Sequence, residues 1–163
     1  MTNAYDEIYL DKAKTSLGRM LDFATYDLNY SLVDFWDKFL SSNIANKIES
    51  GDVTTVVGKS GVELAYEVLN DLEQDIKPRF PENRSIEYWT GWAIAYFQWK
   101  TSIPFLEITR VIPINEIANM YNPYHEMDIN QLFDKMLQIF IERKLETNLK
   151  RKRKVAGLSQ KEL

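Results

Sequence analysis

An aromatic-rich run from Ser85 to Lys100, SIEYWTGWAIAYFQWK, is the feature that most limits what this chain can fold into. At helical spacing its apolar residues cover most of the circumference, and only a narrow polar stripe runs through Glu87, Gly91 and Gln98. A helix that is apolar on most sides has to be buried by its neighbours. The run is also shorter than the ~20 mostly apolar residues that cross a bilayer. It therefore predicts the central helix of an all-helical domain.

Four aromatic residues of this run allow a second interpretation. Tyr88, Trp92 and Tyr96 follow one side of the expected helix, and Trp89 lies beside them. Aromatic side chains at helical spacing form core more often than they form a site, so we expect a buried core. The alternative is an aromatic groove for a nucleobase, a peptide or a small molecule.

The rest of the chain predicts more helices and no paired strands. Helices are expected over residues 5–29, 31–42, 42–50, 60–73, 102–112 and 113–121, with a long one from about residue 128. The β-branched segment 52–61 favours a helical turn or loop, because no second strand is available to pair with it. Ile8 and Ile141 are among the residues expected to face inward. The fold class is therefore all-α, a multi-helix domain over residues 1–145.

Local signals mark where several of these helices start and stop. Ser31 and Ser85 are suitable N-caps, and Ser60 with Glu63 forms a capping-box pattern. Gly51 is expected just beyond the end of the third helix. The segment 75–84, with two prolines and mixed charges, is expected to be a loop.

Composition excludes several classes of protein. The chain of 163 residues has no cysteine, which rules out a disulfide scaffold and thiol chemistry. Its first residues lack the basic and apolar regions of a secretory signal, so a soluble, cytoplasmic protein without a membrane segment is expected. His125 is the single histidine, and with no second His or Cys to complete a ligand set we expect neither a metal site nor an enzyme, and no cofactor.

The charge is unevenly distributed. The net charge is −4, yet residues 142–163 contain eight basic and three acidic residues, a net of +5, which leaves −9 for residues 1–141. An acidic body with a basic end suggests two roles, one of them directed at an anionic partner.

The end of the chain, TNLKRKRKVAGLSQKEL, has the pattern of two helices and a turn. A short helix is expected to end at Gly157, and a second helix is expected to begin at Ser159, which forms a capping-box pattern with Glu162. This segment resembles the opening of the Cro/CI-type helix-turn-helix of XRE-family transcriptional regulators. The matching positions are Leu149, Arg153, Gly157, Leu158, Ser159, Gln160, Glu162 and Leu163.

The resemblance implies contact with DNA phosphates. The residues that would make it are Lys150, Arg151, Arg153, Lys154, Gln160 and Lys161. The alternative for each basic residue is a solvated helix end that complements the helix dipole. Residues 146–163 would be only the start of the motif, because the recognition helix of the family lies beyond it. A complete domain would bind DNA, and the family pattern implies a homodimer.

Two body segments, VVGKSGVELAYEVL and EYWTGWAIAYFQW, also look like the N-terminal region of XRE-type regulators. Such regulators often accompany toxin-like genes, so an antitoxin-like or adaptor protein that acts through contact with a toxin-like protein partner is the alternative function. A small-molecule sensor built on the aromatic residues is the third.

Overall fold

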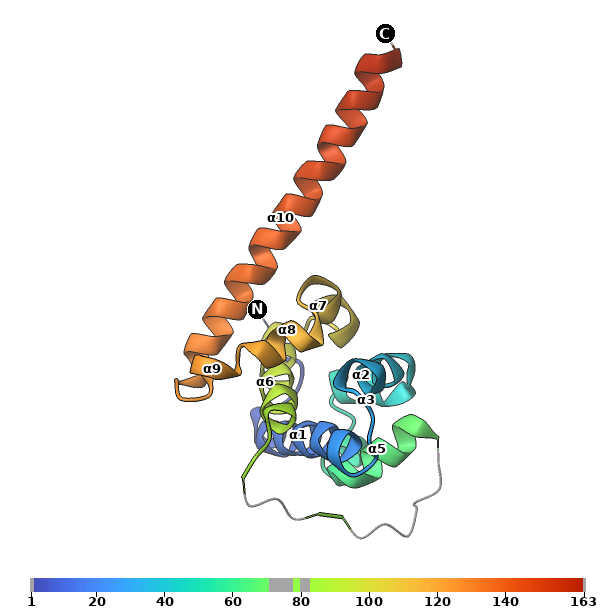
Figure 1. Ribbon diagram of the computed structural model, residues 1–163, viewed down its shortest axis with the longest axis vertical. Coiled ribbons are helices and arrows are strands. Elements are labelled where there is room, and N and C mark those ends of the chain that lie inside the picture. The colour runs from blue at the N-terminus through green and yellow to red at the C-terminus, as the bar shows by residue number, and fades with distance from the viewer. Residues whose placement is uncertain (1, 71–77, 80–82, 163) are drawn as a thin grey trace.

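The computed structural model describes residues 2–70, 78–79 and 83–162, with side chains as far as Gly157. All regular structure within these residues is helical, which confirms the all-α prediction (Figure 1). The elements in order are η1 (Glu7–Tyr9), α1 (Leu10–Tyr26), α2 (Leu32–Ser41), α3 (Asn43–Glu49), α4 (Val53–Val56), α5 (Gly61–Leu69), α6 (Ile86–Thr101), α7 (Phe105–Val111), α8 (Ile114–Asn119), α9 (Tyr121–Tyr124) and α10 (Ile129–Glu162). None of these helices has both the length and the apolar character needed to cross a membrane.

The aromatic-rich helix α6 is the central helix, as predicted, and it crosses α1 at very short range. A Cβ atom added to Gly91 would lie 2.5 Å from the carbonyl oxygen of Leu17, and one added to Gly18 would lie 2.7 Å from that of Tyr88. Only a residue without a side chain allows two backbones to approach this closely. Gly61 places α5 against α1 in the same way, with its added Cβ 2.7 Å from Ser16 O.

One side of α6 forms the core of the domain. Ala93, Ile94 and Phe97 are fully buried, and the ring of Phe97 packs against Phe133 and Phe140 of α10 at 5.4 and 6.3 Å between centroids. The prediction of a polar stripe on α6 is wrong at Gln98, because this residue is buried, with 1% of its surface exposed. Gln98 follows Gly91 by seven residues and so shares its face of the helix, the face that α1 covers.

Several predicted boundaries are confirmed, and others shift. The hydroxyl oxygens of Ser31, Ser60 and Ser85 accept hydrogen bonds from the backbone N–H groups three residues later. Gly51 has the expected positive φ of 71°. Ser42 lies at the N-cap of α3 but donates to Phe39 O at 2.7 Å instead of capping that helix.

Other expectations for the helices are wrong. Ile8 is 75% exposed because it lies in the short η1 turn, ahead of the amphipathic helix α1. The helix that begins at residue 61 ends at Leu69, since Asn70 adopts the left-handed conformation with φ 55°. Ile141 is 48% exposed, whereas Phe140 beside it faces the core. Most of the predicted loop 75–84 lies outside the described residues.

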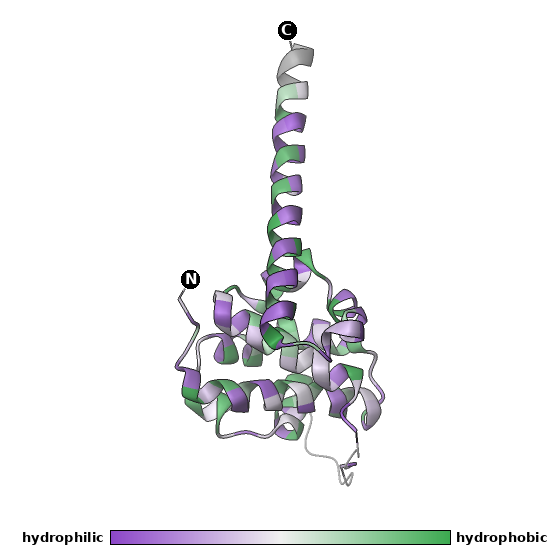
Figure 2. Cartoon of the chain, turned by 90° about the vertical axis from the view of Figure 1, so that its left-hand side faces the viewer, coloured by the Kyte–Doolittle hydropathy of each residue, from purple (hydrophilic) through white to green (hydrophobic). Residues whose placement is uncertain are grey.

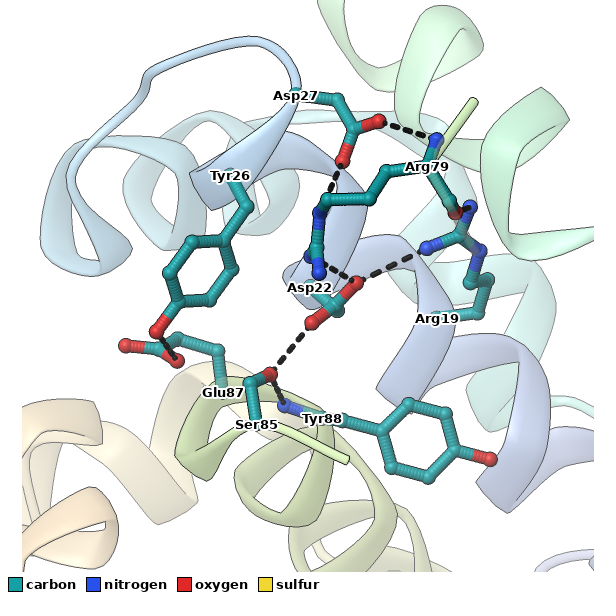
Figure 3. A network of polar contacts seen from close by, with 8 residues as sticks. All are labelled: Arg19, Asp22, Tyr26, Asp27, Arg79, Ser85, Glu87 and Tyr88. Carbon is teal, nitrogen blue, oxygen red and sulfur yellow. Dashed lines mark hydrogen bonds and ion pairs between the residues drawn. The ribbon is translucent and has the colours of Figure 1, made fainter. Parts of the chain in front are cut away.

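A buried carboxylate joins α1 to the start of α6 (Figure 3). Asp22 is 1% exposed and accepts hydrogen bonds from Arg19 at 2.9 Å, Arg79 at 3.0 Å and the Ser85 hydroxyl at 2.6 Å. Asp27 accepts from the backbone N–H of Arg79 at 2.9 Å. These contacts hold the cap of α6 on α1, which fixes the orientation of the aromatic helix.

The long helix α10 has two halves with different surroundings. Its first half packs on the body, where Arg143 pairs with Glu116 of α8 and Lys144 pairs with Glu107 of α7 at 3.0 Å. Its second half extends away from all other helices (Figures 1 and 2), and its described residues are mostly hydrophilic. The expected turn after Gly157 is absent, and the helix continues through Ser159 to Glu162. One glycine costs a helix only about 1 kcal/mol, too little to force an end.

Candidate functional site

A cavity of about 260 Å³ opens where α6, α9 and the start of α10 meet. Its walls are mainly aromatic and apolar side chains from segments about 30 residues apart in the sequence. The lining residues are Arg84, Tyr88, Trp89, Trp92, Tyr121, Tyr124, His125, Met127, Ile129 and Leu132. Concave sites with apolar walls and a few polar groups are the usual form of small-molecule sites.

The predicted groove residues lie partly in this cavity. Tyr88, Trp89 and Trp92 line it and are half-buried, whereas Tyr96 is not among its lining residues. The hydroxyl of Tyr96 instead donates to Asn130 Oδ1 at 2.8 Å. The aromatic helix is therefore core on one side and cavity wall on another, and ligand binding by these residues stays a prediction.

The aromatic groups of α6 and α9 meet in a fixed arrangement. The rings of Trp89 and Tyr121 are nearly perpendicular, at 85°, with centroids 5.6 Å apart. Tyr121 in turn stacks on the His125 imidazole, with the ring centroids 3.8 Å apart and an angle of 4° between the ring planes. His125 Nδ1 lies 2.6 Å from Tyr121 O, and because a carbonyl only accepts, this nitrogen carries the proton. In the neutral ring, Nε2 is then left as an acceptor.

Charged groups of both signs lie near the cavity. The guanidinium of Arg84 lies 4.8 Å from the centre of the Tyr88 ring, and Lys14 Nζ lies 4.7 Å from that of Trp92. None of the lining residues in the described part of the chain is a carboxylate. Glu126, next to His125 in the sequence, is exposed and lies 3.6 Å from its Nε2. The cavity therefore combines aromatic walls with one guanidinium among its described lining residues.

The residues on α9 and the following turn, Tyr121, Tyr124 and His125, were not among the predicted site residues. Their sequence, YNPYHEMD, is dense in aromatic groups, but nothing in it indicates which helix they face. Among the described residues, no three His, Asp or Glu side chains gather to hold a metal ion.

The predicted phosphate-contact residues occupy the projecting half of α10. Lys150, Arg151, Arg153 and Lys154 are all exposed. Lys150, Arg153 and Lys154 are spaced three and four residues apart and so share one side of the helix, and all four residues line one surface together with Thr147. The side chains of Gln160 and Lys161 lie outside the described part. Because the helix is continuous at Ser159, no free N-terminal N–H groups are available there for a phosphate, contrary to expectation.

The fold and these two sites define an all-helical domain with an aromatic cavity and a projecting basic helix. Comparisons with protein-family models, with curated proteins and with solved structures each found no match to this chain.

Proposed function

We propose that this chain is the helical body and the first DNA-contacting segment of an XRE-type transcriptional regulator. The observation that supports the proposal is the XRE-like pattern of residues 149–163 on a helix whose basic side chains are exposed and distant from the body. The basic side chains contact DNA phosphates, and the body associates with a second copy or with another protein.

The distance between the basic residues and the acidic body favours this role. Lys144 makes the last described ion pair with the body, and Lys152 is the centre of the basic run. At about 1.5 Å per residue, the helix separates them by about 12 Å. This distance exceeds the screening length of ~8 Å at physiological salt, so the net charge of −9 on the body weakens phosphate contact only modestly.

Salt-dependent DNA binding tests the proposal. Fluorescence anisotropy with a labelled 20-base-pair duplex would measure affinity as the salt concentration is changed. Each phosphate contact adds about 0.9 to the slope of log affinity against log salt. For the quadruple variant K150A/R151A/R153A/K154A, the magnitude of that slope should therefore be smaller by about 3 to 4, and its affinity for DNA should be much lower.

A matched variant separates local contact from overall charge. K12A/K38A/K47A/R110A removes the same number of positive charges from exposed positions on the body. It should leave the salt slope nearly unchanged. Equal weakening by the two variants, or no measurable binding by the parent chain at 50 mM salt, would reject DNA contact by α10.

A dimer is the second part of the proposal, and an apolar stripe on α10 supports it. Ile141, Leu145 and Leu149 are about half exposed and are spaced four residues apart, on one side of the helix. Pairing this stripe with a second copy would cover it, as in other helix–helix contacts. Sedimentation equilibrium should show a dimer that L145E/L149E converts to a monomer. A parent chain that remains monomeric at 100 µM would contradict self-association and favour the adaptor or antitoxin-like role.

A further inference from the structure

We infer that the aromatic cavity binds a small aromatic carboxylate. The ring of the ligand would lie against Trp89 and Tyr121, and its carboxylate would pair with Arg84. This inference goes beyond the proposed function and does not depend on DNA binding.

The size of the cavity limits the ligand to one ring or two fused rings. Its volume is about 260 Å³, near the lower end of the ~300–1,000 Å³ found for small-molecule pockets. A dry apolar cavity of ~150 Å³ in another protein holds benzene. The present cavity therefore has room for a single ring and a short acidic side chain.

The walls favour a planar ring over an aliphatic chain. Trp89 and Tyr121 meet at 85° and form a corner in which a ring can stack on one face and contact the other edge-on. Aromatic groups prefer these two arrangements because their faces are negative and their edges positive. Tyr121 also stacks on His125, which lines the cavity as well.

The charges select an anion. Arg84 is the one permanently charged side chain among the described lining residues, and its guanidinium lies 4.8 Å from the centre of the Tyr88 ring. A guanidinium is planar and directs its N–H groups along its plane, where they can bind both oxygens of a carboxylate. Aromatic cages also bind quaternary ammonium groups, but the guanidinium of Arg84 in the wall would repel such a cation.

A set of small ligands of different charge tests the inference. Phenylacetate, phenylacetamide and phenethylamine share one ring and one linker, and choline represents the alternative cationic ligand. Isothermal titration calorimetry with the full chain would measure each Kd. We expect phenylacetate to bind about tenfold more tightly than phenylacetamide, and the two cations to bind more weakly than the amide.

Two variants assign the interaction to the cavity. Arg84→Gln should reduce the affinity for phenylacetate about tenfold, to that of the amide, and should leave the amide unaffected. Trp89→Leu should weaken both ring compounds. Arg110→Gln is the matched control, because this exposed arginine on α7 lies beside a different surface near Trp36. Thermal unfolding of each variant would show that the fold is retained.

Three results would overturn the inference. Tighter binding of choline or phenethylamine would identify a cation site. Equal affinity for phenylacetate and phenylacetamide would mean that Arg84 does not select charge. No heat from any ring compound at millimolar concentration would exclude one-ring aromatic acids as ligands. The variant K150A/R151A/R153A/K154A should bind phenylacetate like the parent chain, so failure of DNA binding and failure of the cavity site are distinguishable.

Discussion

The crossing of α1 with α6 and the outer half of α10 are both regular helix, yet different forces maintain them. At the crossing, Gly18 and Gly91 bring two backbones into contact, and Leu17 beside them is fully buried. The outer half of α10 has exposed side chains and extends away from the body. Packing therefore maintains the first region, whereas the second depends on intrinsic helix propensity and on whatever partner it binds.

The largest expected effect is that of Gly91→Ala. The new methyl group would lie 2.5 Å from Leu17 O, and because that atom belongs to the backbone, the two helices would have to separate. We expect a loss of about 3 kcal/mol in the free energy of unfolding, measured by urea denaturation. A loss below about 0.5 kcal/mol would contradict the close crossing, since alanine is otherwise the better helix former.

The next effect concerns the carboxylate that joins these two helices. Asp22→Asn keeps the shape but removes the charge that Arg19 and Arg79 pair with, and it replaces one acceptor with a donor. We expect the free energy of unfolding to fall by about 2 kcal/mol. Asp134→Asn, at an exposed position on α10, is the control and should change stability little. Equal effects from the two would mean that the Asp22 cluster does not hold α6 on α1.

A smaller, pH-dependent effect is expected where α10 leaves the body. The hydrogen bonds from Arg143 hold the pKa of Glu116 below its ordinary value of 4.5. A carboxylate with a lowered pKa contributes stability above its unfolded pKa, and this contribution is lost as the pH falls through the folded pKa. Both side chains are about 40% exposed, so the pair contributes only about 0.5–1 kcal/mol.

Glu116→Gln should therefore lower stability by that amount at pH 7. The difference from the parent chain should shrink as the pH falls below about 4.5, since the parent loses the same ion pair by protonation. Urea denaturation at several pH values measures this, with the exposed Glu146→Gln as control. A difference that persists unchanged at pH 3 would show that the ion pair is not its cause.

The contrast between the two regions also explains what could be predicted from the sequence. The central helix and its Ser85 cap were predictable because each depends on local chemistry. The burial of Gln98 was not predictable, because it depends on which side of α6 is covered by α1. The cavity was only half predictable: Trp89 is visible in the aromatic run, but Tyr121 joins it through tertiary packing.

At the end of α10, in contrast, it was the local sequence signals that gave a wrong prediction. There the local signals, Gly157 and the Ser159 capping pattern, predicted a turn, and the structure has a continuous helix. Because this part of the helix projects away from the body, the outcome depends on propensities that differ by about 1 kcal/mol. A bound partner or DNA can supply more than that and change the local conformation.

The smallest effect is expected for Gly157→Ala, which tests whether α10 is continuous at this residue. An added Cβ at Gly157 meets nothing within 4 Å, so the methyl group is accommodated in open space. In a continuous helix, alanine should increase local helicity slightly and leave the midpoint of thermal unfolding unchanged, because the outer half of α10 adds little to the stability of the body. Circular dichroism at 222 nm and amide exchange of residues 150–160 would measure this.

If Gly157 instead ends a helix in the left-handed conformation, as the XRE-like pattern implies, alanine should speed exchange there and weaken DNA binding. The same Gly→Ala change is thus destabilising at Gly91, and its sign at Gly157 distinguishes a continuous helix from a helix-turn-helix.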